Sequence, residues 1–175
     1  LLKKKKNIRL IDSSKVEKFN DLKFFSNGEA VLLQTADENK FETQNFKVVS
    51  KTKPNSKTLK NLIFAFNVCR FVKSNAIVIT QNETTIGIGS GQPSRLDSCE
   101  LAINKMNKFH KLKNEEILAA SDAFFPFIDG VEKLVQAGVT GIIQPYGSIR
   151  DKEIIDFANK TKTVLVFSKT RHFNH

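Results

Sequence analysis

The fold of this chain depends most on residues 117–130, ILAASDAFFPFIDG, where an apolar run meets a turn with two carboxylates and three aromatic rings. Proline lacks an N–H and holds the preceding residue in extended geometry, so Pro126 predicts a strand over residues 117–125 that stops there. Asp129 is expected to cap a helix over residues 130–137 by accepting the N–H of Glu132 or of the residue before it. A strand end, an aromatic turn and a helix start in succession often form a ligand pocket in α/β domains.

The phenylalanines of this turn have a second explanation, which is that they fill the hydrophobic core. Aromatic residues are buried far more often than they bind a ligand. The pattern alone leaves both explanations open for Phe124, Phe125 and Phe127.

Strand and helix patterns alternate after residue 117. Strands are predicted over 117–125, 140–144 and 163–167, and helices over 130–137 and 149–159. Gly138 stands where a helix end needs positive φ, and residues 145–147 form a turn. This alternation predicts parallel strands with right-handed crossovers, covered by helices.

The N-terminal side is read in the same way. We expect strands over 7–11, 31–33 and 47–49, a loop over 12–29, and a polar, exposed segment over 37–44. A helix is predicted after Pro54, because its apolar residues recur at spacings of three and four. Strands over 76–80 and 84–89 form a hairpin, followed by a glycine-rich corner and a helix from Ser94.

Length and composition limit the classes of protein to which this chain can belong. A chain of 175 residues with 40% apolar residues has enough material for one domain, or for a subdomain of a larger protein. The net charge of +10 suits nucleic acid, a membrane surface or small anions, and also fits a plain compositional bias. Cys69 and Cys99 are predicted to be buried thiols of a soluble, cytoplasmic protein, since no membrane span or signal peptide is evident. The start at Leu1 and the single Met106 indicate a C-terminal piece.

Polar corners at strand ends are the candidate site. Residues 74–75, 87–95 and 145–148 can converge on a ligand in an α/β sheet. The glycine-rich corner lacks the dinucleotide spacing and the P-loop lysine, so a tight turn is the favoured explanation over an anion site. The three histidines form no metal-spaced pair, which predicts no metal site. A frayed basic tail is the ordinary explanation for residues 171–175.

Five motifs in order closely resemble the C-terminal half of the bifunctional purine biosynthesis family, in which aminoimidazole carboxamide ribonucleotide formyltransferase is joined to inosine monophosphate cyclohydrolase. The motifs are Lys73–Ile77, Gly87–Arg95, Ser121–Asp129, Gln144–Ser148 and Arg171–His175. The resemblance implies formyl transfer from 10-formyltetrahydrofolate to the amine of the ribonucleotide, in a homodimer whose sites lie between subunits. It also implies a cytidine-deaminase-like, three-layer α/β fold with a mixed sheet flanked by helices and no zinc.

The resemblance also assigns domains and residues. Residues 1–53 would be the lead-in of the formyltransferase domain and 54–175 its C-terminal deaminase-like subdomain, with the cyclohydrolase domain and the first formyltransferase subdomain outside this chain. The family's Lys-His motif, which supplies the proton-transfer histidine, would lie upstream, so the isolated chain is expected to be inactive. The implied roles are catalysis near the formyl group for Asn75, folate binding for Phe124, Pro126, Phe127 and Asp129, and ribonucleotide binding for Arg171 and His175.

The chemistry of these side chains is compatible with those roles. A folate pterin needs flat apolar walls and a carboxylate that accepts its N–H donors. An asparagine amide can donate to the oxygen that gains charge as the amine attacks the formyl group. An arginine suits a phosphate or a carboxamide oxygen.

Two other functions are compatible with parts of the sequence. A basic α/β module would bind nucleic acid through its lysines, but the phenylalanines lie between acids rather than among basic residues, so neither nucleic acid nor membrane is the expected partner. A remnant that only dimerises is the third alternative.

Overall fold

The computed structural model describes residues 12, 14, 22–35, 37, 46–111 and 114–175. The chain forms two compact units, Leu1–Ala36 and Asp37–His175. No helix in the described ranges is long and apolar enough to cross a membrane.

The smaller unit contains an antiparallel hairpin of β1 (Leu22–Asn27) and β2 (Ala30–Thr35). Asn27 pairs with Ala30 across a two-residue loop, and Gly28 adopts a φ of 57° there. The strand predicted over 31–33 is therefore confirmed, whereas the loop predicted over 12–29 is wrong for β1. The missed signal is Gly28 between two apolar runs, which permits a tight hairpin turn. The strand predicted over 7–11 lies outside the described residues.

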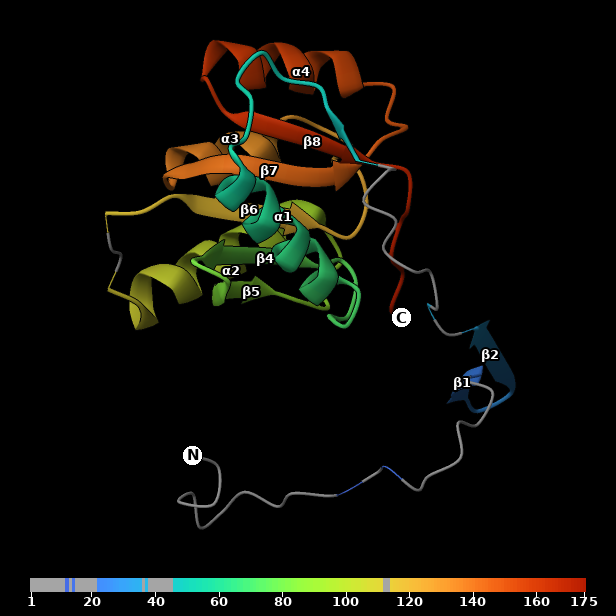
Figure 1. The fold of residues 1–175 in the computed structure, drawn as a ribbon. Helices are drawn as coiled ribbons and strands as arrows, with labels where there is room; N and C mark the ends of the chain where they lie inside the picture. The colour runs from blue at the N-terminus through green and yellow to red at the C-terminus, as the bar shows by residue number, and fades with distance from the viewer. Residues whose placement is uncertain (1–11, 13, 15–21, 36, 38–45, 112–113) are drawn as a thin grey trace. The chain divides into compact units, whose positions relative to one another are not determined.

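The larger unit is built on one mixed sheet of six strands (Figure 1). Its strand order is β3 (Lys47–Val48), β8 (Val164–Ser168), β7 (Val139–Pro145), β6 (Ile117–Ser121), β4 (Ile77–Gln81) and β5 (Thr84–Gly89). β6, β7 and β8 are parallel, as the alternating pattern predicts, while β3, β4 and β5 join antiparallel. β6 ends at Ser121, four residues before the predicted end, because its neighbour β4 begins at Ile77, directly opposite Ser121.

Helices cover both faces of this sheet, which confirms the predicted mixed sheet flanked by helices. One face packs against α1 (Ser56–Cys69), whose buried residues include Leu62 and Phe66. The other packs against α2 (Arg95–Phe109), α3 (Asp129–Gln136) and α4 (Asp151–Lys160). The unit thus has three layers, α1, the sheet and the three remaining helices (Figure 1).

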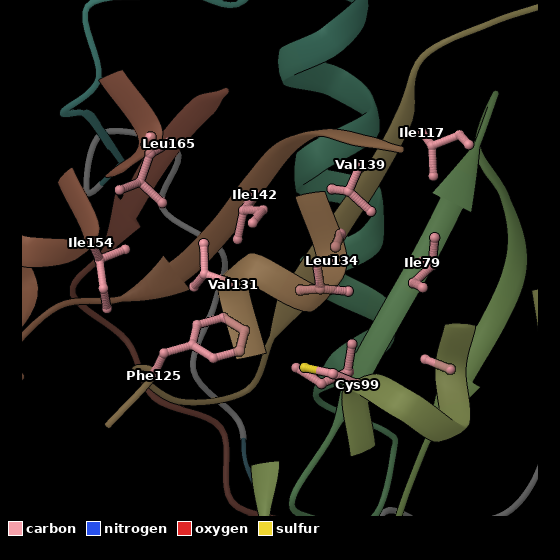
Figure 2. Packing of buried hydrophobic residues seen from close by; sticks show 14 of the residues in the cluster. Ile79, Cys99, Ile117, Phe125, Val131, Leu134, Val139, Ile142, Ile154 and Leu165 are labelled. Atoms are coloured by element: carbon pink, nitrogen blue, oxygen red, sulfur yellow. The ribbon is translucent and has the colours of Figure 1, made fainter. Parts of the chain in front are cut away.

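The core under α2 and α3 is continuous and apolar (Figure 2). Phe125 projects into it beside Val131, and Cys99 faces the same space from α2. Burial raises the pKa of the Cys99 thiol to about 12 and raises the pKa of the Cys69 thiol well above its ordinary value. Both cysteines are therefore buried, uncharged thiols, as the sequence predicts.

Two glycines of β5 let α2 approach the sheet closely. A Cβ on Gly89 would stand 1.8 Å from the carbonyl oxygen of Ser98, and one on Gly87 would stand 2.2 Å from that of Ala102. These glycines therefore serve strand–helix packing, whereas the sequence explained them by a tight turn. That packing fixes the start of α2 beside β4.

Candidate ligand-binding site

A pocket of about 550 Å³ lies where the carboxyl end of β6 meets the start of β4. Four separate segments form its walls: the segment just before β4, the start of α2, the turn after β6 and the C-terminal tail. The lining residues are Asn75, Pro93–Leu96, Ala123–Phe127, Asp129, Arg171 and Phe173. The structure thus brings together every predicted site residue except His175.

The aromatic turn divides its rings between core and pocket. Phe125 is 1% exposed and packs in the core, so the core explanation is correct for this residue. A Cβ on Gly130 would come within 2.8 Å of the Phe125 ring, so this glycine admits the ring against α3. Phe127 is 55% exposed and lines the pocket, which the core explanation does not account for. Phe124 is half-buried and lies between these extremes.

Asp129 does not cap α3, and the predicted N-cap is wrong. The helix already includes Asp129, Ile128 occupies the cap position, and no side chain caps the helix there. The Glu132 N–H donates to the Ile128 carbonyl, and among the described residues the carboxylate of Asp129 accepts only from the neighbouring Gly130 N–H, at 2.7 Å. The rest of this exposed carboxylate faces the pocket and is open to hydrogen-bond donors from a ligand.

Asn75 is held by hydrogen bonds at both ends of its amide. Its Nδ2 donates to the carbonyl oxygens of Gln92, at 3.0 Å, and Pro93, at 3.2 Å. Its Oδ1 accepts from Nη2 of Arg95 at 3.0 Å. The backbone is fixed as well, because Ser98 Oγ donates to the Asn75 carbonyl at 2.7 Å.

Beneath Asn75 lies a buried ion pair that sequence reasoning missed. Arg95 pairs with Asp122, whose side chain is 1% exposed. Ser74 Oγ donates to the other oxygen of the Asp122 carboxylate at 2.6 Å. The sequence did contain a signal for each residue: Asp122 directly follows an apolar strand, and Arg95 begins a helix. Both lie within the motifs quoted above, but neither pattern shows which residue its side chain pairs with.

The C-terminal tail is hydrogen-bonded to this same region, so the frayed-tail explanation is wrong. The His172 N–H donates to the Asp122 carbonyl at 2.9 Å, and the Ser74 N–H donates to the Asn174 carbonyl at 2.9 Å. The buried His172 also contacts Asp37 through Nδ1. Asp37 is half-buried rather than exposed as predicted, and residues 38–44 lie outside the described part.

The C-terminal tail places Arg171 on the wall of the pocket. Its guanidinium lies 4.6 Å from the centre of the Phe124 ring, in cation–π geometry. A Cβ on Gly147 would lie 3.0 Å from Nη2 of Arg171, so the glycine leaves room for this side chain. His175 stacks on Phe173 with ring centres 5.7 Å apart, and it does not line the pocket.

A larger open pocket of about 1020 Å³ adjoins the first and shares Phe124, Pro126 and Phe127 with it. Its other wall comes from residues 147–150 and α4. Arg150 lies 5.1 Å from the centre of the Phe127 ring. The aromatic turn therefore forms a wall shared by two adjoining pockets. Arg171 lies over the Phe124 ring, and Arg150 lies over the Phe127 ring.

The chemistry available here is binding and polarisation. The pocket offers aromatic and proline surface for a flat ring, a carboxylate for N–H donors, a guanidinium for an anion and an amide for an oxygen. Among the described residues, no group of three or more His, Cys, Asp or Glu side chains is arranged to hold a metal ion. The two buried thiols contribute no nucleophile, because their pKa values are raised.

An α/β domain with an aromatic pocket at its strand ends has the architecture typical of domains that bind small molecules. The family model described as the AICARFT/IMPCHase bienzyme matches residues 1–105. The chain belongs to this family, which confirms the resemblance seen in the five motifs.

Relatives match over the whole chain. It is 46% identical to the bifunctional purine biosynthesis protein PurH of Buchnera aphidicola subsp. Schizaphis graminum, over 100% of this chain and 34% of that protein. It is 43% identical to PurH of Leptospira biflexa over 98% of the chain and 34% of the relative, and 42% identical to PurH of Persephonella marina over 100% and 34%. The chain thus spans about a third of the length of these curated relatives.

Proposed function

We propose that this chain forms the folate-binding part of a purine-biosynthesis formyltransferase, which moves the formyl group of 10-formyltetrahydrofolate to the amine of aminoimidazole carboxamide ribonucleotide. In the full-length protein, a cyclohydrolase domain would then close the product to inosine monophosphate. The observation that supports this most is the single pocket that collects Asn75, Phe124, Pro126, Phe127, Asp129 and Arg171.

The folate pterin fits the wall formed by Phe124, Pro126 and Phe127. A pterin is flat and apolar on its faces, and it carries N–H donors on its edge. Within the part of the chain that the structure describes, the Asp129 carboxylate accepts one hydrogen bond, from the Gly130 N–H, so its other acceptor positions are available to those donors. A charged acceptor makes hydrogen bonds about twice as strong as a neutral one.

Asn75 serves formyl transfer as a hydrogen-bond donor. When the amine attacks the formyl carbon, the formyl oxygen gains negative charge, and Nδ2 of Asn75 donates to it in place of the Gln92 or Pro93 carbonyl. The remaining carbonyl bond and the Arg95 bond keep the amide oriented during this exchange. Preorganised donors of this kind contribute about 2.7–4 kcal/mol to transition-state stabilisation.

The ribonucleotide is bound by the C-terminal tail. Arg171 is exposed at the pocket rim and presents a fork of donors to a phosphate or a carboxamide oxygen. His175 would reach the ribonucleotide through a site completed by a second subunit. On this proposal the protein is a cytoplasmic homodimer with a cytidine-deaminase-like fold, and one chain contributes half of each site.

The test is the kinetic effect of Asn75→Ala in the full-length protein. We expect kcat for formyl transfer to fall roughly 100-fold or more while KM for both substrates changes little, because the bond strengthens only in the transition state. Asn114→Ala, in an exposed position that lines a different pocket, is the matched control and should keep kcat. A large rise in KM with kcat intact would make Asn75 a substrate-binding residue instead.

A further inference from the structure

The buried pair of Arg95 and Asp122 has entered the proposed function so far only through the hydrogen bond from Arg95 to the Asn75 amide. The two side chains are 8% and 1% exposed, so both charges have left water. Removing ions from water costs several kcal/mol each, and the attraction between them often does no more than offset that cost. A gain in folding stability is therefore a weak explanation for this buried ion pair. The other hydrogen bonds of Arg95 offer a second explanation.

The guanidinium fork divides its donors between two elements. Nη1 of Arg95 donates to Asp122 and, at 2.9 Å, to Ser121 Oγ, which ties the start of α2 to the end of β6. Nη2 donates to Oδ1 of Asn75 at 3.0 Å. Arg95 thus connects the Asn75 amide to the carboxyl end of β6.

This contact also changes the donor strength of the amide. A charged donor on Oδ1 draws electron density through the amide, so the N–H groups on Nδ2 become better donors. Both Nδ2 contacts run to backbone carbonyls, and one of them has to be given up to a ligand oxygen. The bond from Arg95 is then one of two that hold the amide plane in place.

We propose that Arg95, fixed by Asp122, is a positioning residue that orients and polarises the Asn75 amide for the oxygen on which charge develops. This inference rests on the proposed function, because it names the device that prepares Asn75 for its role. Arg95 also lines the pocket, and the role proposed for it here is the one that acts through its bond to Asn75.

The test is a double-mutant cycle in the full-length protein. Arg95→Met alone would leave a buried, unpaired carboxylate, so the variant is R95M/D122N, in which both groups are neutral and the residue at 122 can still accept from Ser74. We expect it to lower kcat roughly tenfold with KM nearly unchanged. In an Asn75→Ala background the same pair of substitutions should lower kcat no further, because the group through which Arg95 acts is gone.

An equal loss of kcat in both backgrounds would overturn the proposal, as would an unchanged kcat in R95M/D122N. If the double variant does not fold, Arg95→Lys replaces it, since an ammonium keeps the charge but lacks the fork that reaches Asp122 and Asn75 together. The same non-additive loss is expected from that variant.

A readout independent of activity separates this inference from the proposed function. With ¹⁵N-labelled asparagine, the Nδ2 signals of Asn75 are identified by their absence in Asn75→Ala. In R95M/D122N these signals should move and exchange faster with solvent, whereas unchanged signals would refute positioning by Arg95. If they change but the parent protein shows no formyl transfer, the proposed function fails and the positioning contact stands.

Discussion

Phe125 and Phe127 are two residues apart in one turn, yet one is 1% and the other 55% exposed. The difference arises because Pro126 redirects the chain between them, so that Phe125 packs against Gly130 and Phe127 faces outward. The exposed ring would be an unfavourable use of apolar surface in a turn that only filled the core. At the residue scale, the turn thus combines one ring buried in the core with one exposed ring on the wall of a pocket.

Asp129 gives the sharpest single-residue prediction, because it makes no helix cap. Asp129→Asn should keep the melting temperature within a degree or two, since the one bond to Gly130 N–H can be kept by an amide oxygen. The amide also places donors where the pterin N–H groups need an acceptor, so KM for 10-formyltetrahydrofolate should rise roughly tenfold, or about 1.4 kcal/mol. The measurement is folate kinetics on the full-length protein beside a thermal melt.

Glu132→Gln is the matched control for that experiment. Glu132 also lies in the first turn of α3 and carries the same favourable charge toward the helix dipole, but it does not line the pocket. The control should leave folate kinetics unchanged. Equal folate KM values for the two variants would reduce Asp129 to a helix-dipole residue.

Gln144 is a residue whose burial is not matched by hydrogen bonds. Its side chain is fully buried, and within the described part of the chain neither amide atom has a hydrogen-bond partner. Replacing it with the similarly sized, apolar methionine should raise the free energy of unfolding by about 1–3 kcal/mol, since the desolvation penalty disappears. Urea denaturation measures this, with exposed Gln136→Met expected to stay within about 0.5 kcal/mol. A destabilised Gln144→Met would show that the amide is satisfied in solution.

At the scale of elements, β5 and α2 form a tightly constrained contact beside the site. The start of α2 carries Arg95, and the glycines of β5 let the helix lie against the sheet. A side chain at either glycine would push α2 away from β4, and the Arg95 donors would then move away from Asn75. The precision of the site therefore depends on residues that do not line it.

Gly89→Ala tests this packing. Its Cβ would stand 1.8 Å from a backbone oxygen of α2, which cannot move as a side chain can. We expect a loss of about 1–3 kcal/mol or more in unfolding free energy, together with a lower kcat in the full-length protein. Thr84→Ala, at the exposed start of the same strand, should change stability far less. Equal effects from both variants would show that α2 relaxes without cost.

At the scale of the whole molecule, the features that could be predicted are the helices and strands, because their patterns involve residues close together in the sequence. Apolar spacing of three and four located α1, and the alternation after Ile117 gave β6, β7 and β8 as parallel strands. The failures involve geometry that no local pattern encodes. The predicted start of α3 is off by one residue, and this places Asp129 inside the helix instead of at its N-cap. The ion pair of Arg95 with Asp122 joins side chains 27 positions apart in the sequence. The motifs predicted the residues that line the pocket, but they did not predict the ion pair of Arg95 and Asp122 that supports it.

The two buried thiols make a prediction for the stability of the whole larger unit. Their pKa values are raised in the folded state, chiefly by burial, to about 12 for Cys99. Above pH 9.0, the ordinary value for these thiols, the unfolded chain releases protons that the folded chain retains. The folded state then binds more protons, so the free energy of unfolding falls as pH rises, by up to about 1.4 kcal/mol per pH unit for each thiol. The stabilisation is complete below pH 9.0 and is lost progressively toward pH 12 for Cys99.

Urea denaturation between pH 8 and 10 measures this slope, and Cys99→Ala isolates one thiol. Lysine and tyrosine side chains also begin to titrate in this range, but they are common to both proteins, so the difference between the two slopes belongs to Cys99. The variant should be less stable at pH 8, where it lacks the packing of the sulfur, and should lose less stability on going to pH 10. Parallel curves would show that Cys99 ionises equally in the folded and unfolded states, and would contradict the raised pKa expected from its burial in the core.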